Sequence, residues 1–143
     1  MRIRIKARDN RVYSGKEVAD YFREITEIDE SITKTGLENL IRNYVIKNKW
    51  EIKNIPVNEV LKDPDFKEFW NNVDSEEDLY EDYYDRDFDD WELNQPIILY
   101  KDNNKTFLVD GYHRTAQHLL NEESTIKAYV NVKEWNKWNL NNG

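Results

Sequence analysis

A short polar corner from Gly111 to Arg114, with the sequence Gly-Tyr-His-Arg, holds the residues best suited to chemistry in this chain. Gly111 is one of four glycines and stands where an apolar run gives way to a helical pattern. A glycine there lets the backbone approach a ligand, and the unpaired amides and positive dipole of a helix start attract anions. His113 and Arg114 add two side-chain phosphate donors to the same turn. The spacing predicts a phosphate site, although no Walker-type glycine loop is present.

Residues 94–130 supply the elements that must position this corner. Their pattern predicts a strand, a turn, a second strand, the corner, a helix and a further strand. The apolar run from Thr106 to Val109 leads into the corner, and Ala116, Leu119 and Leu120 follow at helical spacing. A strand that ends in a glycine corner and continues as a helix would aim the helix amides at a ligand.

This segment resembles the ParB/sulfiredoxin superfamily. The resemblance lies in Gln95-Pro96-Ile97 at the start of a strand and in the run from Leu108 to Arg114 that passes through the corner into a helix. It covers roughly residues 50–132. In that family a Gly-x-[Arg/His]-Arg corner holds nucleotide phosphates, so the resemblance implies a bound nucleotide such as ATP or CTP, with Mg²⁺ entering alongside the phosphates.

The resemblance also implies individual roles. Tyr112 would stack on the nucleotide or donate its hydroxyl, and Arg114 would make the charged contact. Asp110 could cap the helix, orient His113, touch a nucleotide hydroxyl or hold the Mg²⁺, and capping is the simplest of these roles. The plainer alternative is a tight turn with a solvent-exposed arginine and a capping histidine. The predicted nucleotide-binding residues are Gln95, Asp110, Gly111, Tyr112, His113, Arg114 and Thr115.

Departures from the family limit the activity. Sulfiredoxin chemistry needs a cysteine directly after the corner glycine, but Tyr112 stands there and the chain has no cysteine. The chromosome-segregation members carry further domains that 143 residues cannot hold. We therefore expect a free-standing nucleotide-binding accessory protein of a phage or plasmid, acting in DNA-related regulation. A Mg²⁺-dependent nuclease or phosphotransferase is an alternative, because some family members are described in those terms.

Length favours one compact domain, with or without a small appendage. The resemblance implies an α/β (α+β) fold with a small mixed sheet and flanking helices. We expect an N-terminal strand and two helices over residues 1–49 and the ParB/sulfiredoxin-like domain over residues 50–143, with an acidic insertion at about 63–93. No apolar run approaches the roughly 18 residues that span a bilayer, so we expect a cytoplasmic protein without membrane contact. The sequence sets no oligomeric state, and a dimer is compatible with it.

The N-terminal third carries basic residues and two predicted helices. Ser14 and Glu17 have the spacing of a capping box that starts the first helix, which we place through Ile25. A second helix is predicted after Gly36, and the pair resembles helix-turn-helix modules, although the connection between them is longer than usual. DNA is then a candidate partner, and Arg42, Lys47 and Lys49 would contact its phosphates. We favour the alternative, in which both helices pack on the sheet.

Acidic residues concentrate in one block. Residues 59–93 contain fifteen acidic residues and three basic ones, whereas the whole chain has a net charge of −8. A solvated loop is the simplest interpretation. Aromatic residues within 74–91 nevertheless recur at helical spacing, so a carboxylate face could imitate a nucleic acid and inhibit a host defence nuclease, as anti-CRISPR or anti-restriction proteins do. The candidate contacts with such a nucleic-acid-binding host protein are Asp85, Asp87, Asp89 and Asp90.

The sequence contains no recognisable metal site. His113 and His118 are five residues apart, which is not the spacing that places two ligands on one helical face. The aspartates after residue 84 begin like a calcium loop, but Asp90 replaces its glycine and Pro96 its final glutamate.

Overall fold

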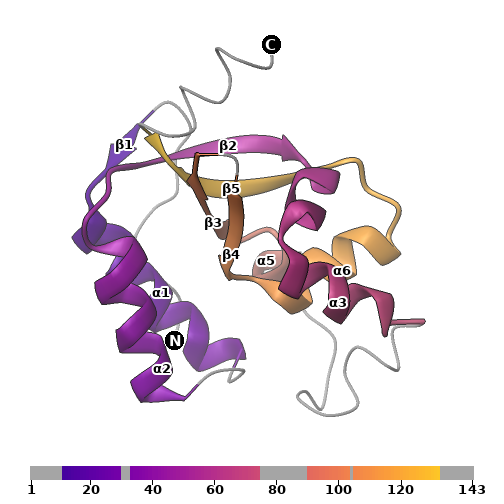
Figure 1. Ribbon diagram of the computed structural model, residues 1–143, viewed down its shortest axis with the longest axis horizontal. Coiled ribbons are helices and arrows are strands. Elements are labelled where there is room, and N and C mark those ends of the chain that lie inside the picture. The colour runs from indigo at the N-terminus through magenta and orange to yellow at the C-terminus, as the bar shows by residue number, and fades with distance from the viewer. Residues whose placement is uncertain (1–10, 30–32, 75–89, 104, 133–143) are drawn as a thin grey trace.

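The computed structural model (Figure 1) describes residues 11–29, 33–74, 90–103 and 105–132. These residues form a mixed α/β fold with one five-stranded sheet, which confirms the predicted fold class. The elements are β1 (Val12–Tyr13), α1 (Gly15–Asp29), α2 (Lys34–Leu40), the π-helical turn η1 (Ile41–Val45), β2 (Trp50–Pro56), the 3₁₀ helix η2 (Val57–Lys62), α3 (Pro64–Asn71), α5 (Asp90–Leu93), β3 (Ile97–Asp102), β4 (Lys105–Asp110), α6 (Tyr112–Leu120) and β5 (Thr125–Asn131).

The sheet has the strand order β1-β2-β5-β3-β4. Neighbouring strands are antiparallel except β3 and β5, which run parallel. The predicted succession over residues 94–130 is confirmed, since β3, β4, α6 and β5 follow one another along the chain. Of the strand predicted to run to Val12, the described part is β1, and residues 1–10 lie outside the described ranges.

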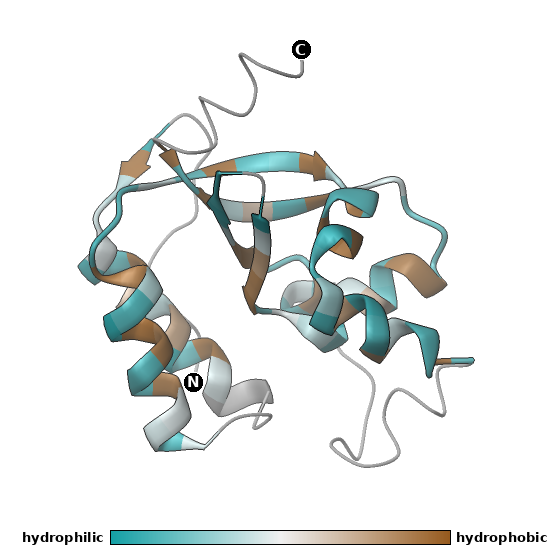
Figure 2. Cartoon of the chain, in the orientation of Figure 1, coloured by the Kyte–Doolittle hydropathy of each residue, from teal (hydrophilic) through white to brown (hydrophobic). Residues whose placement is uncertain are grey.

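Helices cover both faces of the sheet. Figure 1 shows α1 and α2 on one side of the β3–β4 hairpin and α3, α5 and α6 on the other. Side chains alternate accordingly along β3, where Ile98 packs with the residues of α1 and α2 while Ile97 and Leu99 pack with those of η2 and α3. Hydrophobic and hydrophilic residues also alternate along α1 and α2 (Figure 2), as expected of helices with one buried side.

The N-terminal helices share a core with the sheet. Phe22 of α1 and Ile41 of η1 belong to the same buried cluster as Trp50 of β2 and Tyr129 of β5. The boundary that we predicted at residues 49 and 50 therefore does not divide two hydrophobic cores. The structure supports the interpretation that these helices pack on the sheet.

The start of α1 is as predicted, but its end is not. The Ser14 hydroxyl accepts a hydrogen bond from the Glu17 amide at 3.1 Å, and the Glu17 carboxylate accepts one from the Ser14 amide at 3.1 Å. This capping box is confirmed. The helix continues to Asp29, past the predicted end at Ile25, and α2 begins at Lys34. The connection is shorter than expected, so its length no longer argues against a helix-turn-helix.

Asp63 fixes the position of α3. One carboxylate oxygen accepts hydrogen bonds from the amides of Asp65 and Phe66, at 2.9 and 3.4 Å, and thereby caps the helix. The other oxygen accepts the amide of Leu108 at 2.6 Å, on the edge strand β4. Phe66 is fully buried. Asp63 and Phe66 therefore anchor α3 to the core, and the acidic insertion that we expect at about 63–93 stays a prediction.

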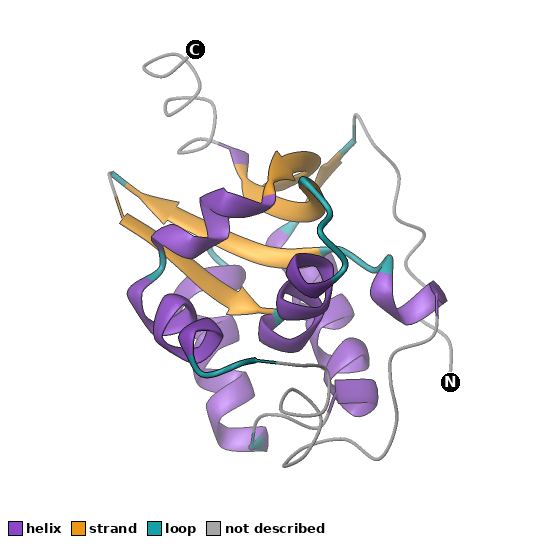
Figure 3. Ribbon diagram, turned by 90° about the vertical axis from the view of Figure 1, so that its right-hand side faces the viewer, coloured by secondary structure: helices purple, strands orange, loops and turns teal. Residues whose placement is uncertain are grey.

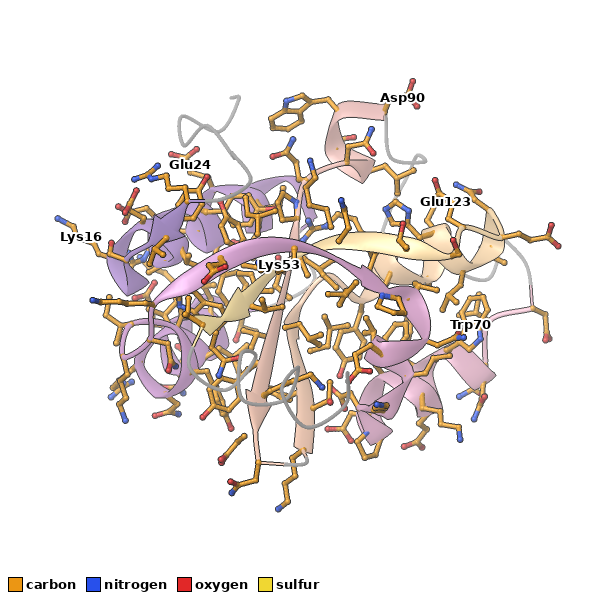
Figure 4. All side chains as sticks on the ribbon, turned by 90° about the horizontal axis from the view of Figure 1, so that it is seen from above. Lys16, Glu24, Lys53, Trp70, Asp90 and Glu123 are labelled. Atoms are coloured by element: carbon orange, nitrogen blue, oxygen red, sulfur yellow. The ribbon has the colours of Figure 1, made fainter. Side chains whose placement is uncertain are left out.

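Much of the acidic block lies outside the described residues. Asp85, Asp87 and Asp89 lie outside the described residues. Asp90 is exposed at the start of α5, and its side chain points outward (Figure 4). The predicted helix over residues 74–91 therefore stays a prediction.

A buried ion pair joins η2 to the β3–β4 hairpin. The Lys101 ammonium donates to the Glu59 carboxylate and, at 3.0 Å, to the Thr106 hydroxyl. Burial alone would raise the pKa of Glu59, but hydrogen bonds from Lys101 and Lys62 lower it, so the carboxylate stays charged. Breaking such a pair would leave a buried charge, so the network holds η2 and the following α3 against the sheet.

Within the described ranges, none of the helices combines the length and apolarity that a bilayer crossing requires.

Candidate functional site

Gly111 forms the turn between β4 and α6, as the sequence predicted. Its φ angle is +116°, in the left-handed region that favours glycine. A β-carbon built at this position would lie 2.4 Å from Cγ2 of Ile97, so the strand also requires a residue without a side chain. Gly111 is the N-cap of α6 and provides no side-chain cap. The first amides of the helix therefore have no partner within the helix itself.

A cavity of about 370 Å³ opens at this corner. It runs along the end of β4, between α1 and α2 on one side and α3 and α6 on the other; Figure 3 faces the α3 and α6 side. Its size is near the lower end of the range for small-molecule sites, roughly 300 to 1,000 Å³. The lining residues are Phe22, Leu40, Phe69, Phe107, Leu108, Val109, Asp110, Gly111, Tyr112 and His113.

Arg114 points into the protein and is not among the residues that line this cavity. Its side chain is only 1% exposed, and one guanidinium nitrogen lies 2.6 Å from a carboxylate oxygen of Asp110. A second nitrogen donates to the carbonyl oxygens of Gln95 and Pro96, both at 2.9 Å, and to the Tyr21 hydroxyl at 3.2 Å. The prediction that Arg114 contacts a phosphate is therefore corrected: its guanidinium is occupied by internal partners. The alternative of a solvent-exposed arginine is wrong as well.

Gln95 is also placed differently from the prediction. Its side-chain amide donates to the Trp91 carbonyl at 3.1 Å, and its carbonyl accepts from Arg114. The residue lines a second, polar cavity of about 200 Å³ together with His118 and Glu123. The structure does not bring the Gln95 side chain to the Gly111 corner.

Asp110 is the carboxylate of the corner cavity and is paired with Arg114. Because of this ion pair, the main role of Asp110 is to fix the position of Arg114. A role in holding Mg²⁺ or a nucleotide hydroxyl would be secondary. Among the described residues, no group of three or more His, Asp or Glu side chains is arranged to hold a metal ion.

Tyr112 and Thr115 have mainly packing roles. The Tyr112 ring lies edge-on to Phe66 and Phe69, with ring centroids 5.4 and 5.5 Å away, and burial raises the pKa of its hydroxyl. Tyr112 lines the cavity, but its ring also packs against α3. Thr115 is fully buried, and within the described part of the chain its hydroxyl has no hydrogen-bond partner. The Thr115 side chain is therefore not accessible to a ligand.

His113 lies in the cavity wall as a neutral base. It is 4% exposed, its ring is 5.3 Å from that of Phe69, and burial lowers its pKa to about 4. At neutral pH the imidazole therefore carries no charge and offers no positive charge to a phosphate.

No family model, curated protein or solved structure matches this chain. The ParB/sulfiredoxin resemblance stays a prediction, and the function must follow from the geometry of the corner.

The predicted site residues include four of the ten described residues that line the cavity, so most of its wall was not predicted. Phe22 and Leu40 come from the N-terminal helices, and Phe69 comes from α3. Phe107 could have been found, because it alternates with Leu108 along β4 and precedes the corner by four residues. No local signal indicates Phe22, since the residues of β4 and α6 that line the cavity with it are more than eighty residues away in the sequence.

The basic residues proposed to contact DNA lie on the surface. Arg42 in η1 and Lys47 and Lys49 after it are exposed, and Arg42 donates to the Asn39 side chain at 2.5 Å. Their exposure is compatible with phosphate contacts, and that role stays a prediction.

Protonation of His113 is expected to destabilise the protein. The pKa falls from 6.5 to about 4 on folding, so between these values the unfolded chain binds more protons than the folded one. Stability should decrease as the pH falls from 6.5 to 4, by about 3 kcal/mol from this residue. Urea denaturation across this range measures the effect. Because carboxylates titrate nearby, the relevant quantity is the difference from a His113→Phe variant, whose decline should be shallower, while His118→Gln should retain the steep decline.

Proposed function

We propose that the protein binds a nucleotide in the corner cavity, with a phosphate group at the first turn of α6 and the base between aromatic side chains. The observation that carries this proposal is the start of α6, which has no side-chain cap and opens into a cavity with aromatic walls. Backbone amides at a helix start favour anions, and phenylalanine rings stack on flat heterocycles. A nucleotide combines these two chemical groups in one ligand.

Different parts of the cavity wall would contact the phosphate group and the base of such a ligand. Gly111, Tyr112 and His113 line the cavity at the helix start. Phe22 and Phe107 contribute rings from α1 and β4.

Arg114 supports the site indirectly in this proposal. Its ion pair with Asp110 offsets the negative charge of the carboxylate that lines the cavity. Without that pairing, Asp110 would repel a phosphate at the same corner. The arginine is thus a positioning residue, in place of the direct phosphate contact that the sequence suggested.

Filling the cavity should abolish binding while the fold persists. Leu40 is partly buried at the cavity rim, so Leu40→Trp is expected to occupy the ligand space. Isothermal titration with nucleoside mono-, di- and triphosphates should show binding by the parent protein and at least about tenfold weaker binding by the variant. Thermal shift provides a second readout, because a ligand that binds only the folded state raises its melting temperature.

Leu61→Trp is the matched control for this experiment. Leu61 in η2 is also partly buried, but it does not line the cavity. This control should bind like the parent. If Leu40→Trp retained full affinity, or if no nucleotide bound the parent, the proposed function would be rejected.

The other functions considered from the sequence stay predictions. Inhibition of a host nuclease depends on Asp85, Asp87 and Asp89, which lie outside the described residues. DNA-related regulation depends on the exposed basic residues near η1. For catalysis as a nuclease or phosphotransferase, the described residues contain no metal-binding cluster.

A further inference from the structure

Among the described residues, the corner cavity has no cation to match a polyphosphate. The ten described residues that line it include neither lysine nor arginine. Asp110 is the one acidic side chain among them, and it is paired with Arg114. The Arg114 guanidinium thus offsets the charge of the one described carboxylate that lines the cavity.

The remaining positive potential is small. The start of a helix is equivalent to roughly half an elementary charge. His113 is uncharged at neutral pH, since burial lowers its pKa to about 4. Asp63 and Asp65 lie close enough to Tyr112 to raise the pKa of its hydroxyl further, so they add negative potential on the α3 side of the corner.

The free-energy cost of burying charge then limits how many phosphate groups the ligand can carry. A single phosphate ester carries about −1.5 to −2 charges at neutral pH, and backbone amides can partly satisfy its oxygens. Each added phosphate brings more negative charge into a cavity walled mainly by Phe22, Phe69, Phe107 and Leu108. Desolvating such charge without a paired cation is costly.

The described cavity wall also gives little support for a Mg²⁺ ion that would accompany a triphosphate. Mg²⁺ at nucleotide sites is bound through carboxylates and phosphate oxygens. The one lining carboxylate, Asp110, is 5% exposed and lies 2.6 Å from the Arg114 guanidinium. Recruiting it to a metal would break a buried ion pair.

We infer that the ligand is a nucleoside monophosphate, bound without a metal ion, and that the cavity discriminates against di- and triphosphates. This inference rests on the proposed function and specifies its ligand. It departs from the ATP or CTP with Mg²⁺ that the sequence resemblance implied. The charge of the wall, together with a cavity volume of about 370 Å³, sets the preference.

A titration series tests the order of affinities. Adenine and cytosine nucleosides and their mono-, di- and triphosphates would each be titrated into the full chain, once with EDTA and once with Mg²⁺. The expected result is that a monophosphate binds at least about tenfold more tightly than its triphosphate and than its nucleoside. EDTA should leave monophosphate binding unchanged.

The possible outcomes separate the two proposals. A triphosphate that binds as tightly as the monophosphate, or binding that requires Mg²⁺, overturns the inference and leaves nucleotide binding intact. A nucleoside that binds as well as its monophosphate also overturns it, because the phosphate then makes no contact with α6. If no compound binds, the proposed function and the inference both fall.

A charge-adding variant tests the cause of the preference. Leu40→Lys places an ammonium at the cavity rim, where a long side chain can keep its charge near water. We expect this variant to gain about tenfold in triphosphate affinity, since a charge-assisted hydrogen bond contributes that much. Leu61→Lys is the control and should change nothing. If the preference came from size alone, Leu40→Lys would leave the triphosphate affinity as it was.

Discussion

Replacing Arg114 with methionine is expected to lower the free energy of unfolding by about 3–5 kcal/mol. The substitution keeps a long side chain but removes a guanidinium that is 1% exposed and lies 2.6 Å from Asp110. It leaves the buried Asp110 carboxylate without the guanidinium, and it removes a hydrogen-bond donor to the carbonyl oxygens of Gln95 and Pro96. Urea denaturation followed by circular dichroism at pH 7 measures the loss.

Two further variants distinguish a stranded charge from lost packing. Asp110→Leu combined with Arg114→Met should recover part of the stability, because neither charge is then left without its partner. Arg23→Met is the surface control, since Arg23 is exposed and pairs with Glu38 and Asp20. Its effect should stay below about 1 kcal/mol. A loss at Arg114 no larger than at Arg23 would show that the buried ion pair has little importance.

Gly111→Ala is expected to destabilise the protein by about 2–5 kcal/mol. A φ angle of +116° is unfavourable for alanine, and the added β-carbon would meet Cγ2 of Ile97 at 2.4 Å. Because the corner is fixed between β4 and α6, relief of the clash would displace the helix start. Thermal and urea denaturation measure the stability, and nucleotide titration of the folded fraction measures the geometry of the site.

Gly36→Ala is the matched control. Gly36 lies within α2, where alanine is the better helix former, so this substitution should be neutral or stabilising by up to about 1 kcal/mol. Equal effects of the two substitutions would contradict the structural explanation for Gly111.

Local signals in the sequence predicted the local structure well. The capping box at Ser14 and Glu17 involves residues three apart, and both hydrogen bonds are present. The glycine corner was predictable because an apolar strand pattern changes there to a helical one, and only a few residues decide that change. A comparable signal at Asp63 and Pro64 was overlooked: an N-cap residue followed by proline is typical of a helix start.

The direction of the Arg114 side chain could not be predicted in this way. An arginine in the first turn of a helix suits a phosphate and suits buried carbonyl oxygens equally. Its partner Tyr21 is ninety-three residues away in the sequence. The same limit applies to Lys101 and Glu59, forty-two residues apart, whose pairing depends on how η2 lies against the sheet. Such contacts follow from tertiary packing, which residue spacing does not report.

The cavity is built from segments that are synthesised at different times. Phe22 and Leu40 emerge from the ribosome early, whereas His113 is added more than seventy residues after Leu40. Since translation adds roughly 5–20 residues per second, a nascent chain spends several seconds with one wall of the cavity and without the other. Any ligand of this cavity can therefore engage only a nascent chain that already extends past His113, so its occupancy would distinguish chains with both walls of the cavity from chains with one.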